Sequence, residues 1–149
     1  MLNENLKLRG DVALVLKDKN GNVKEKREIN NLIVTAGLTF ICSRMAGTSA
    51  NVMSHMALGS GTTAAAAGDT DLESILGSRE ALDSTTASSN TITYVSSFEA
   101  GEGTGAVTEA GIFNAATSGT MLCRTVFSVV NKEADDTMSV TWTITLTAS

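Results

Sequence analysis

The clearest pattern in the chain is a strict alternation of apolar and polar residues near its end. In residues 137–148, Met, Val, Trp, Ile, Leu and Ala alternate with Thr and Ser. A period of two predicts a long β-strand with one buried face, centred on Trp142, and one face of hydroxyl groups. Because a solvated strand face usually carries some Lys or Glu, we expect a second sheet or a neighbouring subunit to cover the hydroxyl face.

Shorter segments of the same kind predict further strands. They are residues 11–17, 22–28, 55–59, 79–83, 91–98, 106–113 and 121–130, and residues 29–34 are predicted to enter the core. Asn20-Gly21 between the first two strands is a strong hairpin signal. The charged return strand, residues 24–28, is typical of a sheet edge that avoids unwanted pairing. The polar residues 84–90 are predicted to be a flexible connection.

One amphipathic helix is predicted over residues 35–46, capped by Thr35 and ended by Gly47. Its apolar residues recur at i, i+3, i+4 and i+7 and are Leu38, Ile41, Cys42 and Met45. We expect this apolar face to pack on the sheet and to cover the core around Trp142. One or two further helical turns are predicted over residues 69–76, where acidic residues stand at the start.

Together these elements predict an all-β fold, a β-sandwich or a jelly-roll-like domain, with one inserted α-helix and an N-terminal charged β-hairpin. The length of 149 residues is that of one ordinary domain. We expect residues 1–10 to form an N-terminal arm and residues 11–149 a single β-rich domain. The predicted core residues are Leu38, Ile41, Phe98, Phe113, Phe127, Trp142 and Ile144.

Charge is low and unevenly distributed. Charged residues make up 18% of the chain and the net charge is -5, yet residues 1–28 carry seven Lys or Arg against five Asp or Glu. The absence of a broad basic face argues against a nucleic-acid-binding protein. A surface rich in hydroxyls and poor in charge suits contact with another protein, because little charge must be desolvated there. The slightly basic N-terminal segment could contact an acidic neighbour.

The residue types of catalytic and metal sites are sparse. His55 is the single histidine, so a catalytic triad would need it, but it stands in an apolar strand and is predicted to be packed or interfacial. Cys42 and Cys123 do not have zinc-ligand spacing with it, and their pairing is possible but not implied. The Gly59–Thr63 segment, Gly-Ser-Gly-Thr-Thr, lacks the lysine of a phosphate-binding loop and is predicted to be a turn. We predict no cofactor, no metal and no catalysis.

Two groups of carboxylates are candidate sites. The first, which echoes a calcium loop but has Ser74 where that loop requires glycine, is Asp69, Asp71, Glu73 and Glu80. The second could supply a pair for glycoside hydrolysis and is Glu99, Glu102 and Glu109. With aromatic residues at 4%, the chain offers no platform on which a sugar could stack. For both groups we favour ordinary polar or surface roles.

Arg124 stands inside a predicted strand, on the face opposite Cys123. An arginine in such a place pairs with a carboxylate, for which Glu109 is the candidate, or it contacts a partner chain. The predicted partner interface consists of basic residues, namely Lys7, Arg9, Arg27 and Arg124.

The N-terminal sequence has no apolar segment typical of a signal peptide. No apolar run approaches the length of a membrane span. We therefore expect the protein to be made and folded in a cytoplasm, where both thiols start reduced.

Several short motifs follow one another between residues 29 and 148. They are Asn30-Asn31-Leu32-Ile33-Val34-Thr35-Ala36-Gly37-Leu38, His55-Met56-Ala57-Leu58-Gly59-Ser60-Gly61-Thr62-Thr63, Asp69-Thr70-Asp71-Leu72, Glu109-Ala110-Gly111-Ile112-Phe113, Gly119-Thr120-Met121-Leu122-Cys123-Arg124 and Val140-Thr141-Trp142-Thr143-Ile144. In this order they resemble a set of small virion structural proteins of tailed bacteriophages. That set includes capsid decoration (cement) proteins and tail-fibre or collar components.

The resemblance implies a non-enzymatic virion protein on the capsid surface, assembled in the cytoplasm of a bacterial host. We expect a capsid decoration protein that stabilises the head by bridging major capsid protein subunits. Its expected partners are the major capsid protein and copies of itself, as a dimer or trimer, with no nucleic acid and no membrane. The alternative is a tail, collar or fibre component that contacts tail proteins or a host receptor. A third class, a small hydrolase, would need His55 and Glu109.

Overall fold

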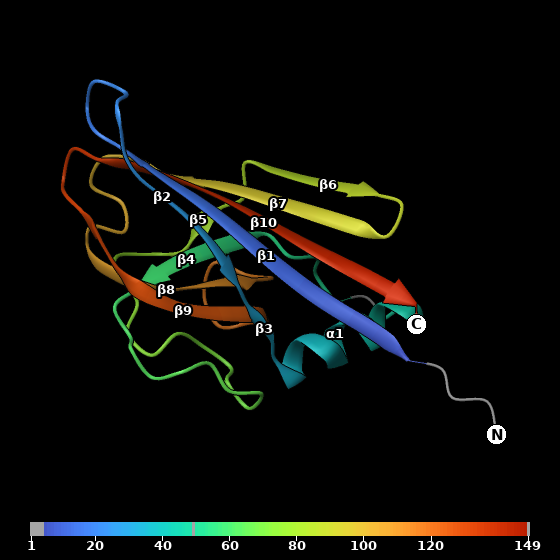
Figure 1. The fold of residues 1–149 in the computed structure, drawn as a ribbon. Coiled ribbons are helices and arrows are strands. Elements are labelled where there is room, and N and C mark those ends of the chain that lie inside the picture. The colour runs from blue at the N-terminus through green and yellow to red at the C-terminus, as the bar shows by residue number, and fades with distance from the viewer. Residues whose placement is uncertain (1–4, 49, 149) are drawn as a thin grey trace.

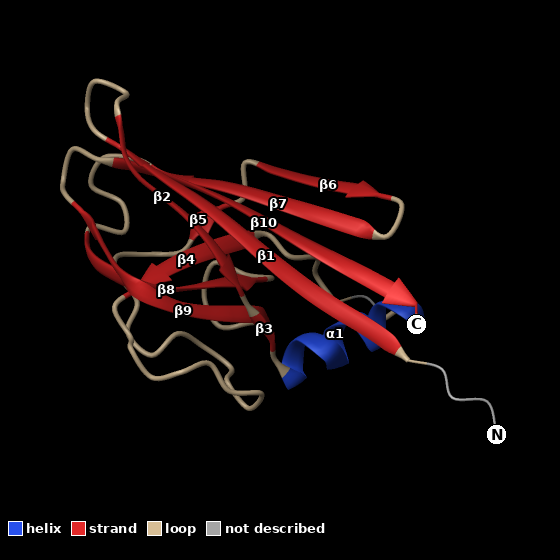
Figure 2. Ribbon diagram, in the orientation of Figure 1, coloured by secondary structure: helices blue, strands red, loops and turns tan. Residues whose placement is uncertain are grey.

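The computed structural model of this protein describes residues 5–48 and 50–148. The strands are β1 (Leu6–Lys17), β2 (Val23–Asn30), β3 (Leu32–Ile33), β4 (His55–Gly59), β5 (Glu80–Ala81), β6 (Ser84–Ser88), β7 (Thr91–Phe98), β8 (Gly105–Phe113), β9 (Met121–Lys132) and β10 (Thr137–Ala148). They form two antiparallel five-stranded sheets with the orders β2-β1-β10-β7-β6 and β3-β9-β8-β4-β5. The sheets pack face to face as a β-sandwich, with the helix at one end (Figure 1). The predicted all-β fold with one helix is confirmed (Figure 2).

Strand β10 lies at the centre of the first sheet and has the bounds that the alternation predicts. Its apolar residues, among them Trp142 and Ile144, are buried against the second sheet. Its Thr and Ser residues point to the other side and are mostly half-buried. The expectation that a second sheet covers the hydroxyl face is therefore wrong, because the second sheet covers the apolar face.

The N-terminal charged hairpin is confirmed, but its first strand is longer than predicted. The Asp18 carboxylate accepts hydrogen bonds from the Asn20 and Asn22 N–H groups at 2.9 and 3.0 Å, and Gly21 supplies the positive φ of 82° that this turn requires.

Strand β1 begins at Leu6, so residues 6–10, assigned to the arm from the sequence, pair with β10. The sequence pattern does not predict that the strand extends to Leu6, because Gly10 interrupts the apolar alternation. Gly10 is needed there, since a Cβ would stand 1.3 Å from Asn31 Oδ1. Residues 1–4 of the predicted arm lie outside the described residues.

The main core lies between the two sheets and contains most of the predicted residues. Phe98, Trp142 and Ile144 are buried there, and Phe113 is buried in a smaller adjoining cluster. Phe127 is only partly buried. It lies where the pairing of β8 with β9 is irregular, since Val107 pairs with Val130 whereas Glu109 pairs with Val126.

Helix α1 (Thr35–Met45) matches the predicted span, but a different face of it packs inward. Leu38 and Met45 are 42% and 85% exposed, and Cys42 is exposed as well. Ile41 packs against the core as predicted, together with Phe40, which the predicted face does not include. The placement of Leu38 in the core is therefore wrong.

Gly37 explains the orientation of α1. It is buried against strand β9, and a Cβ at this position would stand 2.1 Å from the Leu122 carbonyl oxygen. This close backbone approach fixes which side of the helix meets the sheet. The N-cap is Val34, without a side-chain hydrogen bond, so the prediction of Thr35 as the cap is also wrong. No helix among the described residues is long and apolar enough to cross a membrane.

Two further segments differ from the prediction. Residues 84–90 are not a flexible connection, because residues 84–88 form strand β6 at one edge of the first sheet. Residues 69–76 form no helical turns and belong to a loop that runs from β4 to β5. The N–H groups of Glu73 and Ser74, which a helix would direct to its own carbonyls, donate to the Glu109 carboxylate instead.

Candidate functional site

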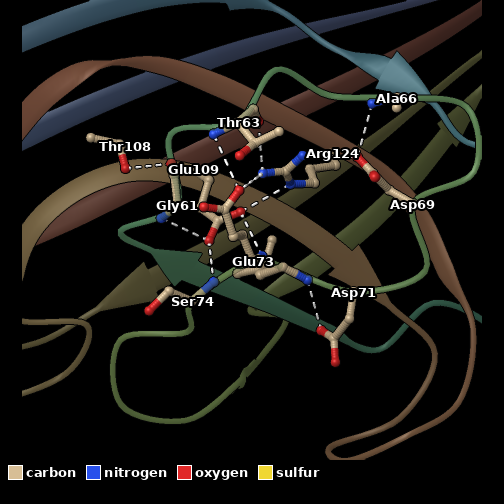
Figure 3. Close-up of polar contacts among 11 residues, drawn as sticks. Gly61, Thr63, Ala66, Asp69, Asp71, Glu73, Ser74, Thr108, Glu109 and Arg124 are labelled. Carbon is tan, nitrogen blue, oxygen red and sulfur yellow. Dashed lines mark hydrogen bonds and ion pairs between the residues drawn. The ribbon is translucent and has the colours of Figure 1, made fainter.

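The most deeply buried charged residue in the described chain is Glu109 on strand β8, which is 0% exposed. Its Oε1 atom accepts the N–H groups of Gly61 and Ser74 at 3.0 and 2.8 Å. Its Oε2 atom accepts the Glu73 N–H at 3.0 Å and Nε of Arg124 at 2.9 Å (Figure 3). Four donors thus surround the two oxygens.

Arg124 on strand β9 completes this cluster. One terminal nitrogen donates to Asp69 Oδ2 at 2.8 Å, and the other donates to the Thr63 carbonyl at 3.0 Å (Figure 3). Its side chain is 3% exposed. The predicted pairing with Glu109 is confirmed, and the prediction that Arg124 belongs to a partner interface is wrong, because its donors are turned into the protein.

The cluster fastens the long loop between β4 and β5 to the second sheet. Gly61, Thr63, Asp69, Glu73 and Ser74 all lie on this loop and all contact Glu109 or Arg124. The glycines of the Gly-Ser-Gly segment provide the space. A Cβ on Gly59 or on Gly61 would stand 2.5 or 2.6 Å from Glu109 Oε1. The turn predicted for this segment is thus shaped by a carboxylate of the chain itself.

This arrangement is unsuited to acid–base chemistry. A general base needs a free lone pair directed at a substrate proton, whereas both oxygens of Glu109 already accept two hydrogen bonds each. Asp69 and Glu73 face Arg124 rather than each other. Among the described residues, no group of His, Cys, Asp and Glu could hold a metal ion. The other candidate base, His55, is half-buried with Nδ1 2.8 Å from Ser54 Oγ.

Similarity to known proteins gives no further guidance. No protein-family model matches the chain, and no curated protein or solved structure is significantly similar to it.

The outer face of the first sheet, meaning the side turned away from the second sheet, is a broad array of hydroxyl groups. On three adjacent strands the outward positions carry no charge: Ser84, Thr86 and Ser88 on β6, Thr91, Thr93, Val95 and Ser97 on β7, and Thr137, Ser139, Thr141, Thr143, Thr145 and Thr147 on β10. Thr93 and Thr143 lie opposite each other, with their hydroxyl oxygens 3.3 Å apart. This part of the outer face is polar, and little charge must be desolvated when another protein covers it.

Charged residues gather on the remaining two strands of the outer face, β1 and β2. Arg9 and Asp11 form an exposed pair at 3.0 Å on β1. Asp11 and Glu28 line a depression of about 490 Å³ that also reaches Thr141 and Thr143. The outer face therefore combines a neutral half with a half of mixed charge.

The structure does not bring the predicted interface residues together. Lys7 and Arg9 are exposed on β1 and share the outer face. Arg27 points the other way, where it donates to the Ser128 and Val129 carbonyls at 3.2 and 3.3 Å and ties β2 to the second sheet. The hydroxyl array was visible in the sequence on β10, but the contribution of β6 was not.

Two carboxylates that link distant segments have lowered pKa values. A hydrogen bond from the Ala66 N–H, with the Arg124 guanidinium, holds the pKa of Asp69 below its ordinary value of 3.8. The Lys24 ammonium, 2.7 Å from Asp136, likewise lowers the pKa of that carboxyl. A lowered pKa means that the folded chain binds the proton more weakly than the unfolded chain. The stabilisation is complete above the ordinary pKa and disappears as the pH falls through the folded one.

We therefore expect the melting temperature to be nearly constant between about pH 7 and 5 and to fall steeply below about pH 4. Calorimetry over this range measures it. The Asp136→Asn variant should melt earlier than the wild type at neutral pH, and the difference should shrink in acid, where the wild-type carboxylate is protonated too. A wild-type melting temperature that rises on acidification would contradict the expectation.

The two cysteines differ in reactivity because they differ in burial. Both are free; Cys42 is exposed on α1, whereas burial raises the pKa of the Cys123 thiol well above its ordinary value. Since the thiolate is the reactive form, a thiol reagent should label one equivalent in the folded protein and two in urea. Mass spectrometry of the Cys42→Ser variant supplies the control, with no native labelling expected. Rapid native labelling of Cys123 would contradict its burial.

Proposed function

We propose that the protein is a non-enzymatic structural component of a tailed-bacteriophage virion. Specifically, it would act as a capsid decoration protein that bridges major capsid protein subunits on the outer surface of the head. The observation that carries this proposal is the outer face, an array of hydroxyls without charge across β6, β7 and β10. The resemblance of the motifs between residues 29 and 148 to virion proteins of tailed bacteriophages supports this kind of assembly.

The outer face supports a binding role for two physical reasons. An interface of hydroxyls avoids the desolvation cost of buried charge, and it can hydrogen-bond to a partner. Each site need only bind modestly, because many copies act together on one shell. The interior supports the same reading, since the polar cluster at Glu109 is used to hold a loop in place.

The proposal is tested on purified particles of the phage that encodes the chain. Quantitative mass spectrometry should find the protein at a copy number near that of the major capsid protein, and antibody labelling should decorate the head. A dozen copies or fewer, or labelling confined to the tail, would favour the tail, collar or fibre alternative. Absence from the particles would overturn both.

A surface variant tests the role of the outer face. Thr93→Lys places a charge at the centre of the neutral half, where Thr86 and Thr143 lie opposite it. In an interface this charge should lower occupancy on particles by tenfold or more, because burying an unpaired charge costs about 2 kcal/mol or more. Thr117→Lys, in an exposed turn of the second sheet, is the matched control and should bind normally. Equal occupancy of the two variants would exclude the outer face as the binding surface.

A further inference from the structure

Strand β6 is an open sheet edge. It pairs with β7 on one side only, and all five of its residues, Ser-Thr-Thr-Ala-Ser, are exposed. In Figure 1 it runs along the border of the first sheet, with no other strand beyond it. Every second residue of an edge strand directs its N–H and C=O groups outward, so such an edge is a template for another strand.

The β6 edge is also held in place. Beyond its C-terminal end, Asn90 donates from its side chain to the Leu146 carbonyl at 2.9 Å and accepts the Leu146 N–H at 2.9 Å through its own carbonyl. At the other end the Asp83 N–H donates to the Val95 carbonyl at 2.7 Å. The edge is thus ordered before any partner arrives, which lowers the entropic cost of pairing.

The other three edges in the described part of the sandwich are protected or too short. Strand β2 carries five consecutive charged residues, 24–28, the usual device against pairing with other chains. Strands β3 and β5 have two residues each. Of these four edge strands, only β6 combines ordinary length with a lack of charge. It is therefore the edge best suited to pair with another strand.

The sequence of β6 fits a second copy of itself. In an antiparallel pair centred on Thr86, Thr86 lies opposite Thr86 and Ser84 opposite Ser88, while Thr85 lies opposite Ala87. Hydroxyl thus meets hydroxyl on the outer side and small residues meet on the inner side, and cross-strand Thr and Ser pairs are favourable. No charge opposes a like charge.

We propose that this chain forms a two-fold dimer in which β6 pairs antiparallel with β6 of a second copy. The two first sheets become one continuous sheet of ten strands, and the two-fold axis stands perpendicular to it. Both outer faces then point to the same side. The dimer gives a specific form to the self-association that the sequence resemblance implies. Where the proposed function holds, one shell could be bound by both faces at once.

The dimer is measured on the purified full-length chain, without particles. The contact is small for a protein interface, so we expect a concentration-dependent monomer–dimer equilibrium by sedimentation, with a dissociation constant of about 1 mM or tighter. In the dimer, those amide protons of residues 84–88 that point to the free edge should exchange more slowly at high than at low protein concentration. A monomer at every concentration up to about 1 mM would overturn the proposal.

A charge-swap experiment places the contact. Thr86→Lys sets two ammonium groups against each other at the axis and should abolish the dimer, as should Thr86→Glu with two carboxylates. An equimolar mixture of the two variants should restore it as a heterodimer. Circular dichroism should show that each variant is folded, since position 86 is exposed. Dimers of Thr86→Lys alone as tight as those of the wild type would move the contact elsewhere and overturn the proposal.

The outcome is separable from that of the proposed function. Thr93→Lys lies on β7 and leaves every residue of β6 unchanged, so it should dimerise normally, even where it fails to bind particles. Loss of particle binding with an intact dimer would therefore implicate the outer face alone. If the protein dimerises in solution but is absent from phage particles, the proposed pairing of β6 is supported and the proposed virion function is excluded.

Discussion

Replacing Glu109 with glutamine should lower the free energy of unfolding by about 3–5 kcal/mol, because it breaks a buried ion pair while leaving the cation in place. The side-chain volume hardly changes, so packing is not the cause. The amide NH₂ group of the new side chain can only donate, yet every neighbour of the present carboxylate is a donor: the Arg124 guanidinium and the N–H groups of Gly61, Glu73 and Ser74.

The matched control is an ion pair on the surface. Arg9 and Asp11 are as close as the buried pair, at 3.0 Å, but their side chains are 73% and 43% exposed. Asp11→Asn should therefore change the free energy of unfolding by no more than about 1 kcal/mol. Urea unfolding followed by circular dichroism compares the two variants. Equal losses would show that the Glu109 cluster is no more important than a surface pair.

Local hydrogen exchange shows whether Glu109→Gln releases the loop between β4 and β5 or destabilises the whole fold equally. In Glu109→Gln, the amide protons of Gly61, Glu73 and Ser74 should exchange faster than those of the main core. The double variant Glu109→Gln/Arg124→Met should cost less than the sum of the single variants, because the second change removes the charge that the first leaves unpaired. Full additivity would mean that the two residues stabilise the fold independently.

The sequence predicted best where one physical effect dominated. The alternation in β10 marks a strand buried on one face, and the structure confirms its bounds. The Glu109–Arg124 pair was foreseen, since a charge within a buried strand needs a partner. The loop donors that complete the cluster could not be foreseen, because they come from backbone N–H groups of a segment without a repeating pattern.

The failures have equally specific causes. Helix α1 has an apolar face by its periodicity, but the close approach of Gly37 to Leu122 turns another face inward and leaves Met45 exposed. Strand β6 has no apolar periodicity at all, since all its residues are exposed, and its pairing with β7 defines it instead. In both cases a backbone contact between distant segments overrides the local pattern.

Trp142→Ala should lower the free energy of unfolding by about 3–5 kcal/mol, the usual cost of truncating a large aromatic side chain in a core. Trp142 is 0% exposed and lies in the middle of β10, with Val12 of β1 and Tyr94 of β7 opposite it in the register. Because strands hold it on both sides and the second sheet covers it, the surroundings can collapse only partly into the space left behind.

Two further variants test whether the cost of Trp142→Ala comes from lost apolar volume, from a lost hydrogen bond or from the buried position. The indole N–H of Trp142 is buried without a hydrogen-bond partner among the described residues. Trp142→Phe therefore removes apolar volume but no hydrogen bond. It should lower the free energy of unfolding clearly less than Trp142→Ala does. Leu38→Ala, at a position that periodicity assigned to the core but that is 42% exposed, should cost about 1 kcal/mol or less. If Leu38→Ala proved as costly as Trp142→Ala, α1 would have to pack with the face that its sequence pattern predicts, and the close contact at Gly37 would be wrong.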